Sequence, residues 1–225
     1  MTKAKLFDAV QALDVKAVRA ILDARPSLRD ARDRADRNPL HLACSVADGD
    51  PRPMVRLLLD RGIDIEAVSG KDRCPALFFA VARARNAALV KLLLARGAKV
   101  ANAPGAGLFA AGWYDDVHIL DILVGAGADV NDVADTSVFL ACWNWKKFAA
   151  ARRLVQHGAN PNFQDATSGR TALHYGIERE FDPRELRWLV AHGALADIRN
   201  RKGITARTLA ERKRDKRWLE AIASG

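Results

Sequence analysis

The chain has 225 residues, of which 49% are hydrophobic and only 7% aromatic, and its formal net charge is +9. Ala, Leu and Val carry most of the apolar content, which predicts a folded protein built from closely packed helices. No apolar run is long enough to cross a bilayer, and the first residues enter an amphipathic helix without the apolar stretch of a secretory signal. We therefore expect a soluble, cytoplasmic protein with no membrane partner.

The charge is unevenly distributed along the chain. No Lys or Arg occurs between Lys99 and Lys146, whereas six aspartates fall there: Asp115, Asp116, Asp121, Asp129, Asp132 and Asp135. The densest basic stretch lies near the C-terminus, at 199–217. Such a stretch raises the question of nucleic-acid binding.

The three cysteines predict free thiols. Cys44, Cys74 and Cys142 are odd in number, lie far apart and stand in apolar helical surroundings. We expect reduced, packed side chains and no disulfide.

In chain order, the predicted elements are pairs of short helices with a common ending. A first pair at 3–33 closes on Arg-Pro-Ser-Leu at 25–28, without glycine. Five later apolar helical runs end at Gly62, Gly97, Gly127, Gly158 and Gly193, which are 35, 30, 31 and 35 residues apart. Glycine at this place predicts a helix that ends in a left-handed residue.

The pairs also share an opening. Asn-Pro-Leu-His-Leu-Ala at 38–43 and Thr-Ala-Leu-His-Tyr-Gly at 171–176 are its clearest forms, and 75–80 and 136–141 are looser ones. Asn or Thr caps a helix, and Pro is tolerated in the first helical turn. Each opening therefore predicts the start of the first helix of a pair.

These openings and endings resemble those of ankyrin repeats, which open with Thr-Pro-Leu-His and close with Gly-Ala-Asp-Val-Asn. The resemblance covers essentially the whole chain. It implies an all-α fold, an ankyrin-repeat α-solenoid of about seven helix-turn-helix units, including N- and C-terminal caps, joined by hairpin-like turns. We expect a single domain over 1–225, with units at 3–33, 34–69, 70–102, 103–132, 133–166, 167–200 and 201–225. It should act as a monomer, because each unit buries its face on the next.

No residue pattern predicts catalysis. His41 and His174 occupy the motif position, where the resemblance implies a structural hydrogen bond between neighbouring turns. His157 and His192 precede closing glycines, which suits helix capping. The glycines at 104–107 lack the Lys-Ser or Lys-Thr of a phosphate loop, and metal-ligand spacings are absent. We expect no catalytic or metal residues, no cofactor and no small-molecule substrate.

The resemblance also implies a concave face on which partners bind. By alignment to the opening motif, the residues expected there are Arg83, Trp113, Tyr114, Asp115, Asp116, Trp143, Asn144, Trp145, Glu178 and Arg179. Trp and Tyr are frequent binding hot spots, so we expect an aromatic, acidic patch that binds Lys or Arg beside apolar side chains. The alternative is that these rings fill the space between units.

The function expected is a non-catalytic protein–protein interaction module, either an adaptor or an inhibitor. One alternative is an immunity- or effector-type inhibitor that blocks a toxin or enzyme. Another is a nucleic-acid-associated protein that uses the basic C-terminal stretch. Against it, that stretch also fits a solvated capping helix with Trp218, Leu219 and Ile222 packed inward.

Overall fold

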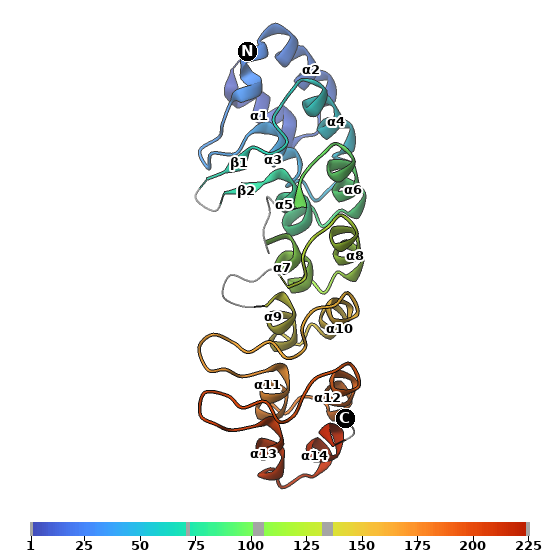
Figure 1. Cartoon of the computed structure of the whole chain (residues 1–225). Helices are drawn as coiled ribbons and strands as arrows, with labels where there is room; N and C mark the ends of the chain where they lie inside the picture. Colours follow the sequence, from blue (N-terminus) through green and yellow to red (C-terminus); the bar gives the residue numbers. More distant parts are fainter. Residues whose placement is uncertain (1, 71–72, 101–105, 132–136, 224–225) are drawn as a thin grey trace. The chain divides into compact units, whose positions relative to one another are not determined.

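The computed structural model describes residues 2–70, 73–100, 106–131 and 137–223 (Figure 1). Its chain divides into two compact units, unit 1 with residues 1–110 and 125–128 and unit 2 with residues 111–124 and 129–225. The aspartates expected at 132 and 135, the motif residue at 136 and the glycine-rich residues at 104–105 lie outside the described part.

Unit 1 is built of short helices with one small hairpin. In chain order these are α1 (Lys3–Gln11), α2 (Val15–Ala24), η1 (Pro26–Asp30), α3 (Pro39–Ala43), α4 (Arg52–Asp60), β1 (Val68–Ser69), β2 (Cys74–Pro75), α5 (Ala76–Phe79), η2 (Ala80–Ala84) and α6 (Ala87–Ala95). The two strands pair antiparallel, with Val68 opposite Pro75. A hairpin-like turn thus leads into the first helix of the next pair. Helix α7 (Ala106–Trp113) begins in unit 1 and ends in unit 2.

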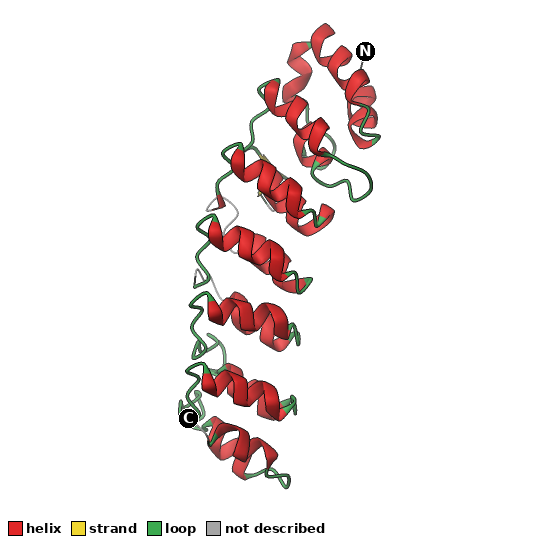
Figure 2. Cartoon of the chain, turned by 90° about the vertical axis from the view of Figure 1, so that its right-hand side faces the viewer, coloured by secondary structure: helices red, strands yellow, loops and turns green. Residues whose placement is uncertain are grey.

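Unit 2 repeats the same helix pair. Its further helices are α8 (Val117–Gly125), α9 (Val138–Asn144), α10 (Phe148–Gln156), α11 (Ala172–Glu178), α12 (Pro183–Ala191), α13 (Ala206–Glu211) and α14 (Arg217–Ile222). The first helices α9, α11 and α13 form one layer, and the second helices α10, α12 and α14 form another (Figure 1). Figure 2 faces the second helices, which lie side by side. The all-α prediction is confirmed.

The closing glycines have the predicted conformation. Gly62, Gly97, Gly127, Gly158 and Gly193 have φ between +77° and +95°. A side chain at such φ is strained, and glycine ends each second helix without that cost.

Buried histidines join one helix pair to the next. His41 Nδ1 accepts the Asn38 N–H at 3.1 Å, which leaves Nε2–H to donate to the Cys74 carbonyl at 3.1 Å. His174 contacts the Ile204 carbonyl in the same way at 3.0 Å. Burial, with Arg32 nearby, lowers the pKa of His41 to about 4, so the ring is neutral. The predicted link between neighbouring turns is confirmed.

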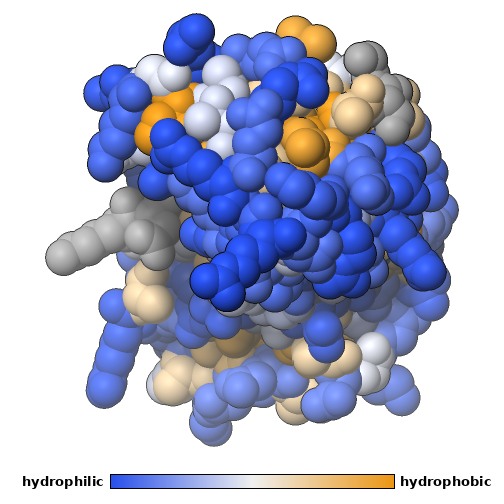
Figure 3. All heavy atoms as spheres, turned by 90° about the horizontal axis from the view of Figure 1, so that it is seen from below, coloured by the Kyte–Doolittle hydropathy of each residue, from blue (hydrophilic) through white to orange (hydrophobic). Residues whose placement is uncertain are grey.

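The last helix pair presents a largely hydrophilic end. Seen from that end, apolar atoms gather toward one edge of the surface (Figure 3). Trp218 and Ile222 are buried, as predicted, and Leu219 is half-buried. A hydrophilic end face suits a terminal unit.

Helices α7 and α9 approach closely at a glycine. A Cβ placed on Gly112 would lie 2.4 Å from Cys142 Sγ. Cys142 is buried, so its sulfur has little room to move. The contact between these helices therefore depends on the absence of a side chain at Gly112.

Replacing this glycine tests that contact. We expect Gly112→Ala to lower the free energy of unfolding by roughly 1–3 kcal/mol, because the added methyl overpacks the helix interface. Gly125→Ala is the matched control, since a Cβ there meets nothing within 4 Å. The double variant Gly112→Ala/Cys142→Ala should recover part of the loss. Equal urea midpoints for wild type and Gly112→Ala would contradict this account.

Candidate partner-binding surface

The first helices of unit 2 end in a row of exposed side chains. Helix α7 ends at Trp113, and Tyr114 follows it, while the C-cap residues of α9, α11 and α13 are Trp145, Arg179 and Arg212. We call these five residues the inner row. Sharp turns follow the ends of α7, α9 and α11, where Asp115, Lys146 and Glu180 adopt φ of 58°, 58° and 54°.

Three aromatic side chains of the inner row are exposed to solvent. The exposed fractions of Trp113, Tyr114 and Trp145 are 52%, 43% and 38%. The rings of Trp113 and Trp145 meet edge to face, with their centroids 4.6 Å apart and their planes at 76°. Two repeats thus contribute to one aromatic cluster.

The prediction that Trp143 belongs to this surface is wrong. Trp143 is fully buried, and its Nε1–H donates to the Ala172 carbonyl at 2.8 Å. Its ring packs against Phe148 and Phe181, with centroid distances of 5.3 and 5.9 Å. This tryptophan fills the space between repeats, which was the alternative considered.

The prediction for Trp143 was wrong because the opening motif of this repeat was aligned one residue too early. Ser137 is the N-cap residue of α9, as Asn38 and Thr171 are of α3 and α11. The looser motif therefore opens at 137 and not at 136. Counted from the N-cap, Trp143 takes the place of the buried Ile177 of α11, not of the exposed Glu178.

The carboxylates near the inner row are bound within the protein. Asp115 accepts the Ala150 N–H at 2.7 Å, and Asp116 caps α8 by accepting the Ile119 N–H at 3.0 Å. In the next repeats, Glu178 pairs with Arg170 at 3.1 Å and Glu180 with Lys213 at 2.7 Å. Asp115, Asp116 and Glu178 were predicted to contact a partner, and Glu180 adjoins the predicted Arg179. All four carboxylates instead make contacts that stabilise the fold.

The cations near the inner row contact a backbone carbonyl and aromatic rings, whereas the carboxylates contact N–H groups and cations. Arg179 Nη1 donates to the Asn144 carbonyl at 3.1 Å, and its guanidinium lies over the Tyr175 ring, 5.1 Å from the centroid. Lys146 lies over Phe181 at 5.3 Å. Asn144, predicted for this face, is half-buried. Arg83, also predicted for this face, is exposed in η2 of unit 1, so it belongs to the other unit.

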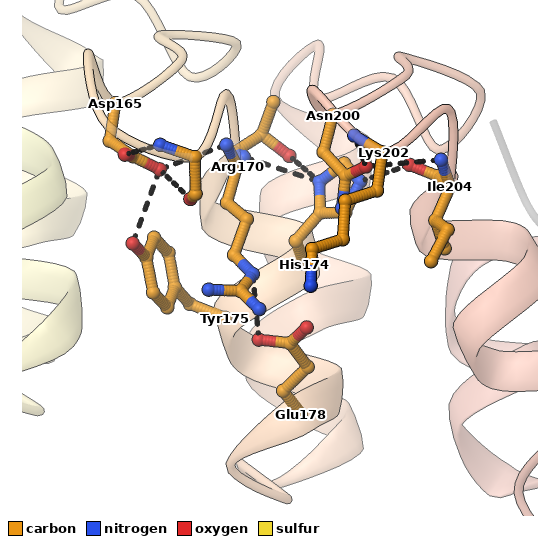
Figure 4. A network of polar contacts seen from close by, with 10 residues as sticks. Asp165, Arg170, His174, Tyr175, Glu178, Asn200, Lys202 and Ile204 are labelled. Atoms are coloured by element: carbon orange, nitrogen blue, oxygen red, sulfur yellow. Dashed lines mark hydrogen bonds and ion pairs between the residues drawn. The ribbon is translucent and has the colours of Figure 1, made fainter.

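A polar network holds the loop before α11 (Figure 4). Asp165 accepts hydrogen bonds from the Ser168 hydroxyl at 2.6 Å, the Arg170 N–H at 2.9 Å and the Tyr175 hydroxyl at 3.2 Å. Burial opposes ionisation, but these hydrogen bonds outweigh it and lower the pKa of Asp165 to about 2. The network fixes Tyr175, on whose ring Arg179 rests. Sequence reasoning did not single out Asp165 for this part.

Comparison with known proteins agrees with the fold. Residues 6–104 match the family model of ankyrin repeats, in three copies. The ankyrin repeat domain of Bcl-3 is 24% identical, with a TM-score of 0.82 and 97% of each chain covered. That of human ASB11 is 20% identical, with a TM-score of 0.75 and 96% and 95% covered. Residues 6–104 are thus similar to ankyrin repeats, and the likeness to these two structures shows that the chain has the ankyrin-repeat fold.

Two curated proteins are each similar to this chain over part of their own length. An ankyrin repeat protein of Acanthamoeba polyphaga mimivirus is 38% identical over 74 residues, which are 32% of this chain. A palmitoyltransferase of Drosophila melanogaster is 26% identical over 221 residues, which are 96% of it. The chain spans only 17% and 34% of the length of these relatives.

Within the described ranges, no helix is both long and apolar enough to cross a membrane. The same ranges hold no cluster of three or more His, Cys, Asp or Glu that could bind a metal ion.

Acid titration tests the Asp165 network. Because the folded pKa is lowered, its contribution to stability is present above the ordinary value of 3.8 and is lost as the pH falls toward about 2. We expect Asp165→Asn to be less stable than wild type at neutral pH and to lose less free energy of unfolding across this window. Asp8→Asn, whose side chain makes no hydrogen bond in the described structure, is the control. Parallel pH profiles for wild type and Asp165→Asn would contradict the assignment.

Proposed function

We propose that this chain is a non-catalytic protein-binding module and that its partner docks on the inner row. The observation that carries the proposal is the aromatic cluster of Trp113, Tyr114 and Trp145. Such rings in contact across two repeats are costly to leave in water unless a partner covers them. Tyr and Trp are also the residues that most often dominate binding energy.

The cluster suits binding because it is held rigidly. Trp113 and Trp145 stand at the ends of helices from adjacent repeats, and Asp115 ties the turn after α7 to α10 through the Ala150 N–H. Arg179 ties α11 to α9 through the Asn144 carbonyl. A surface that is ordered before binding loses little conformational entropy when the partner arrives.

An adaptor and an inhibitor would both bind their partner through this surface. The same holds for an inhibitor of the immunity or effector type that blocks a toxin or enzyme. They differ in what the partner presents, since an inhibitor covers the partner's active site and an adaptor leaves it open. An assay of partner activity with and without the chain separates the two.

The basic C-terminal stretch favours a protein partner over a nucleic acid. Trp218 is buried and donates to the Phe181 carbonyl at 2.9 Å, so it offers no face for base stacking. Lys213 and Arg217 pair with Glu180 and Asp215 at 2.7 and 2.6 Å. These pairs reduce the charge available to phosphates.

We further propose that the chain has no catalytic activity of its own and works in the cytoplasm. All three cysteines are free, which suits a reducing compartment. Burial raises the pKa of Cys44 and raises that of Cys142 to about 12, so neither supplies a reactive thiolate. The similarity to a palmitoyltransferase covers a third of that enzyme and transfers no activity.

Truncation of the tryptophans tests the proposal. With a partner isolated from the native cell and then purified, we expect Trp113→Ala and Trp145→Ala each to weaken binding by roughly 30-fold, the effect of losing a hot spot worth about 2 kcal/mol. Leu195→Ala is the control, because Leu195 is 58% exposed and lies outside the inner row. Titration calorimetry that finds unchanged affinity for both tryptophan variants would exclude this site.

A further inference from the structure

We propose that the inner row binds an extended segment in which an aromatic or large apolar side chain is followed by acidic ones. This inference rests on the proposed function and names the chemistry of the partner. It reverses the expectation from sequence, where the aspartates at 115 and 116 suggested a basic partner. The reversal follows from which charges are already paired within unit 2.

The acids of the surface already have partners in the protein. Asp115 and Asp116 each accept a backbone N–H, at 2.7 and 3.0 Å. Glu178 and Glu180 each form an ion pair with a cation of their own chain, at 3.1 and 2.7 Å. A basic partner would have to compete with these contacts.

The cations of the surface lack such partners. In the described structure, Lys146, Arg179, Arg212 and Arg214 form no ion pair with any carboxylate, and all four are exposed. Cations at a helix C-terminus interact favourably with the helix dipole, which accounts for Arg179 and Arg212 at the C-caps of α11 and α13. The dipole does not engage the guanidinium donors as a carboxylate does. Apart from the Arg179 Nη1–H that is bonded to the Asn144 carbonyl, these donors remain available to a carboxylate of a partner.

The aromatic and the cationic side chains of the inner row form one continuous surface. Trp113 meets Trp145 across α7 and α9, Arg179 bonds to the carbonyl of Asn144 across α11 and α9, and Lys213 pairs with Glu180 across α13 and α11. The surface therefore passes from aromatic at the end of α7 to cationic at the end of α13.

The spacing of the helices sets the spacing of the partner residues. Packed helices lie about 8–10 Å apart, and an extended chain advances about 3.3 Å per residue. One repeat thus corresponds to about three partner residues. An apolar side chain seated on Trp113 and Trp145 places acidic side chains about three residues away at Arg179 and about six away at Arg212.

Selection from a random peptide library tests this chemistry. The library, displayed on phage, is selected on the immobilised full chain and counter-selected on the Trp113→Ala/Trp145→Ala variant. We expect enriched peptides to carry Trp, Phe, Tyr or Leu with Asp or Glu about three and six residues away. Enrichment of basic or uncharged peptides, or no enrichment over the counter-selected variant, would overturn the inference.

Charge reversal then tests the pairing. The most enriched peptide should bind Arg179→Glu and Arg212→Glu at least 10-fold more weakly than wild type, and its affinity should fall as salt rises. Arg187→Glu is the matched control, because Arg187 is exposed on α12 and makes no ion pair in the described structure. Circular dichroism melting of each variant separates lost binding from lost folding. Equal losses for Arg187→Glu and Arg179→Glu would contradict a local pairing.

The outcomes separate this inference from the proposed function. If the selected peptides lose affinity for the tryptophan variant but not for the arginine variants, the proposed binding site stands and its preference for acidic peptides is contradicted. Peptides that bind the double tryptophan variant as tightly as wild type overturn the site itself. Tighter binding of a mixed-sequence DNA oligonucleotide than of any selected peptide, lost in Arg179→Glu, would assign the cations to nucleic acid and also overturn the inference.

Discussion

A buried side-chain N–H that donates to a backbone carbonyl of the neighbouring repeat is the contact on which this architecture depends. His41 donates to Cys74 in unit 1, and Trp143 and His174 donate to Ala172 and Ile204 in unit 2. Each bond satisfies a carbonyl at the entry to the next helix pair, where an unpaired buried carbonyl would be costly. The bonds orient each first helix, and with it the residues at its end.

The exposed surface follows from this constraint. Trp143 is held inward by its bond to Ala172, and the residue two positions later, Trp145, then falls at the helix end and faces solvent. A one-residue difference in register decides which tryptophan is structural and which is available to a partner. The fold defines the scaffold, whereas the side chains at these helix ends are what a partner would recognise.

Local signals in the sequence were enough to predict the helix pairs and the closing glycines, because each depends on the conformation of a few adjacent residues. The linking histidines were expected only from the resemblance to ankyrin repeats, since their acceptor carbonyls lie 33 and 30 residues away. The register of α9 was not predictable in this way. Thr136 and Ser137 are both capable helix caps, and packing against later repeats selects between them. The partners of Asp115 and Glu180 lie 35 and 33 residues away, so no local pattern could show that these charges are engaged.

The central claim, that Trp113 and Trp145 are contact residues and Trp143 is structural, is tested most directly by the indole N–H signals in nitrogen-15 NMR spectra. The chain has five tryptophans, so each gives one resolvable signal that single substitutions assign. On titration with a purified partner, we predict large shifts or broadening for Trp113 and Trp145 and little change for Trp143 and Trp218. Unchanged signals of Trp113 and Trp145 in a saturated complex would contradict the account.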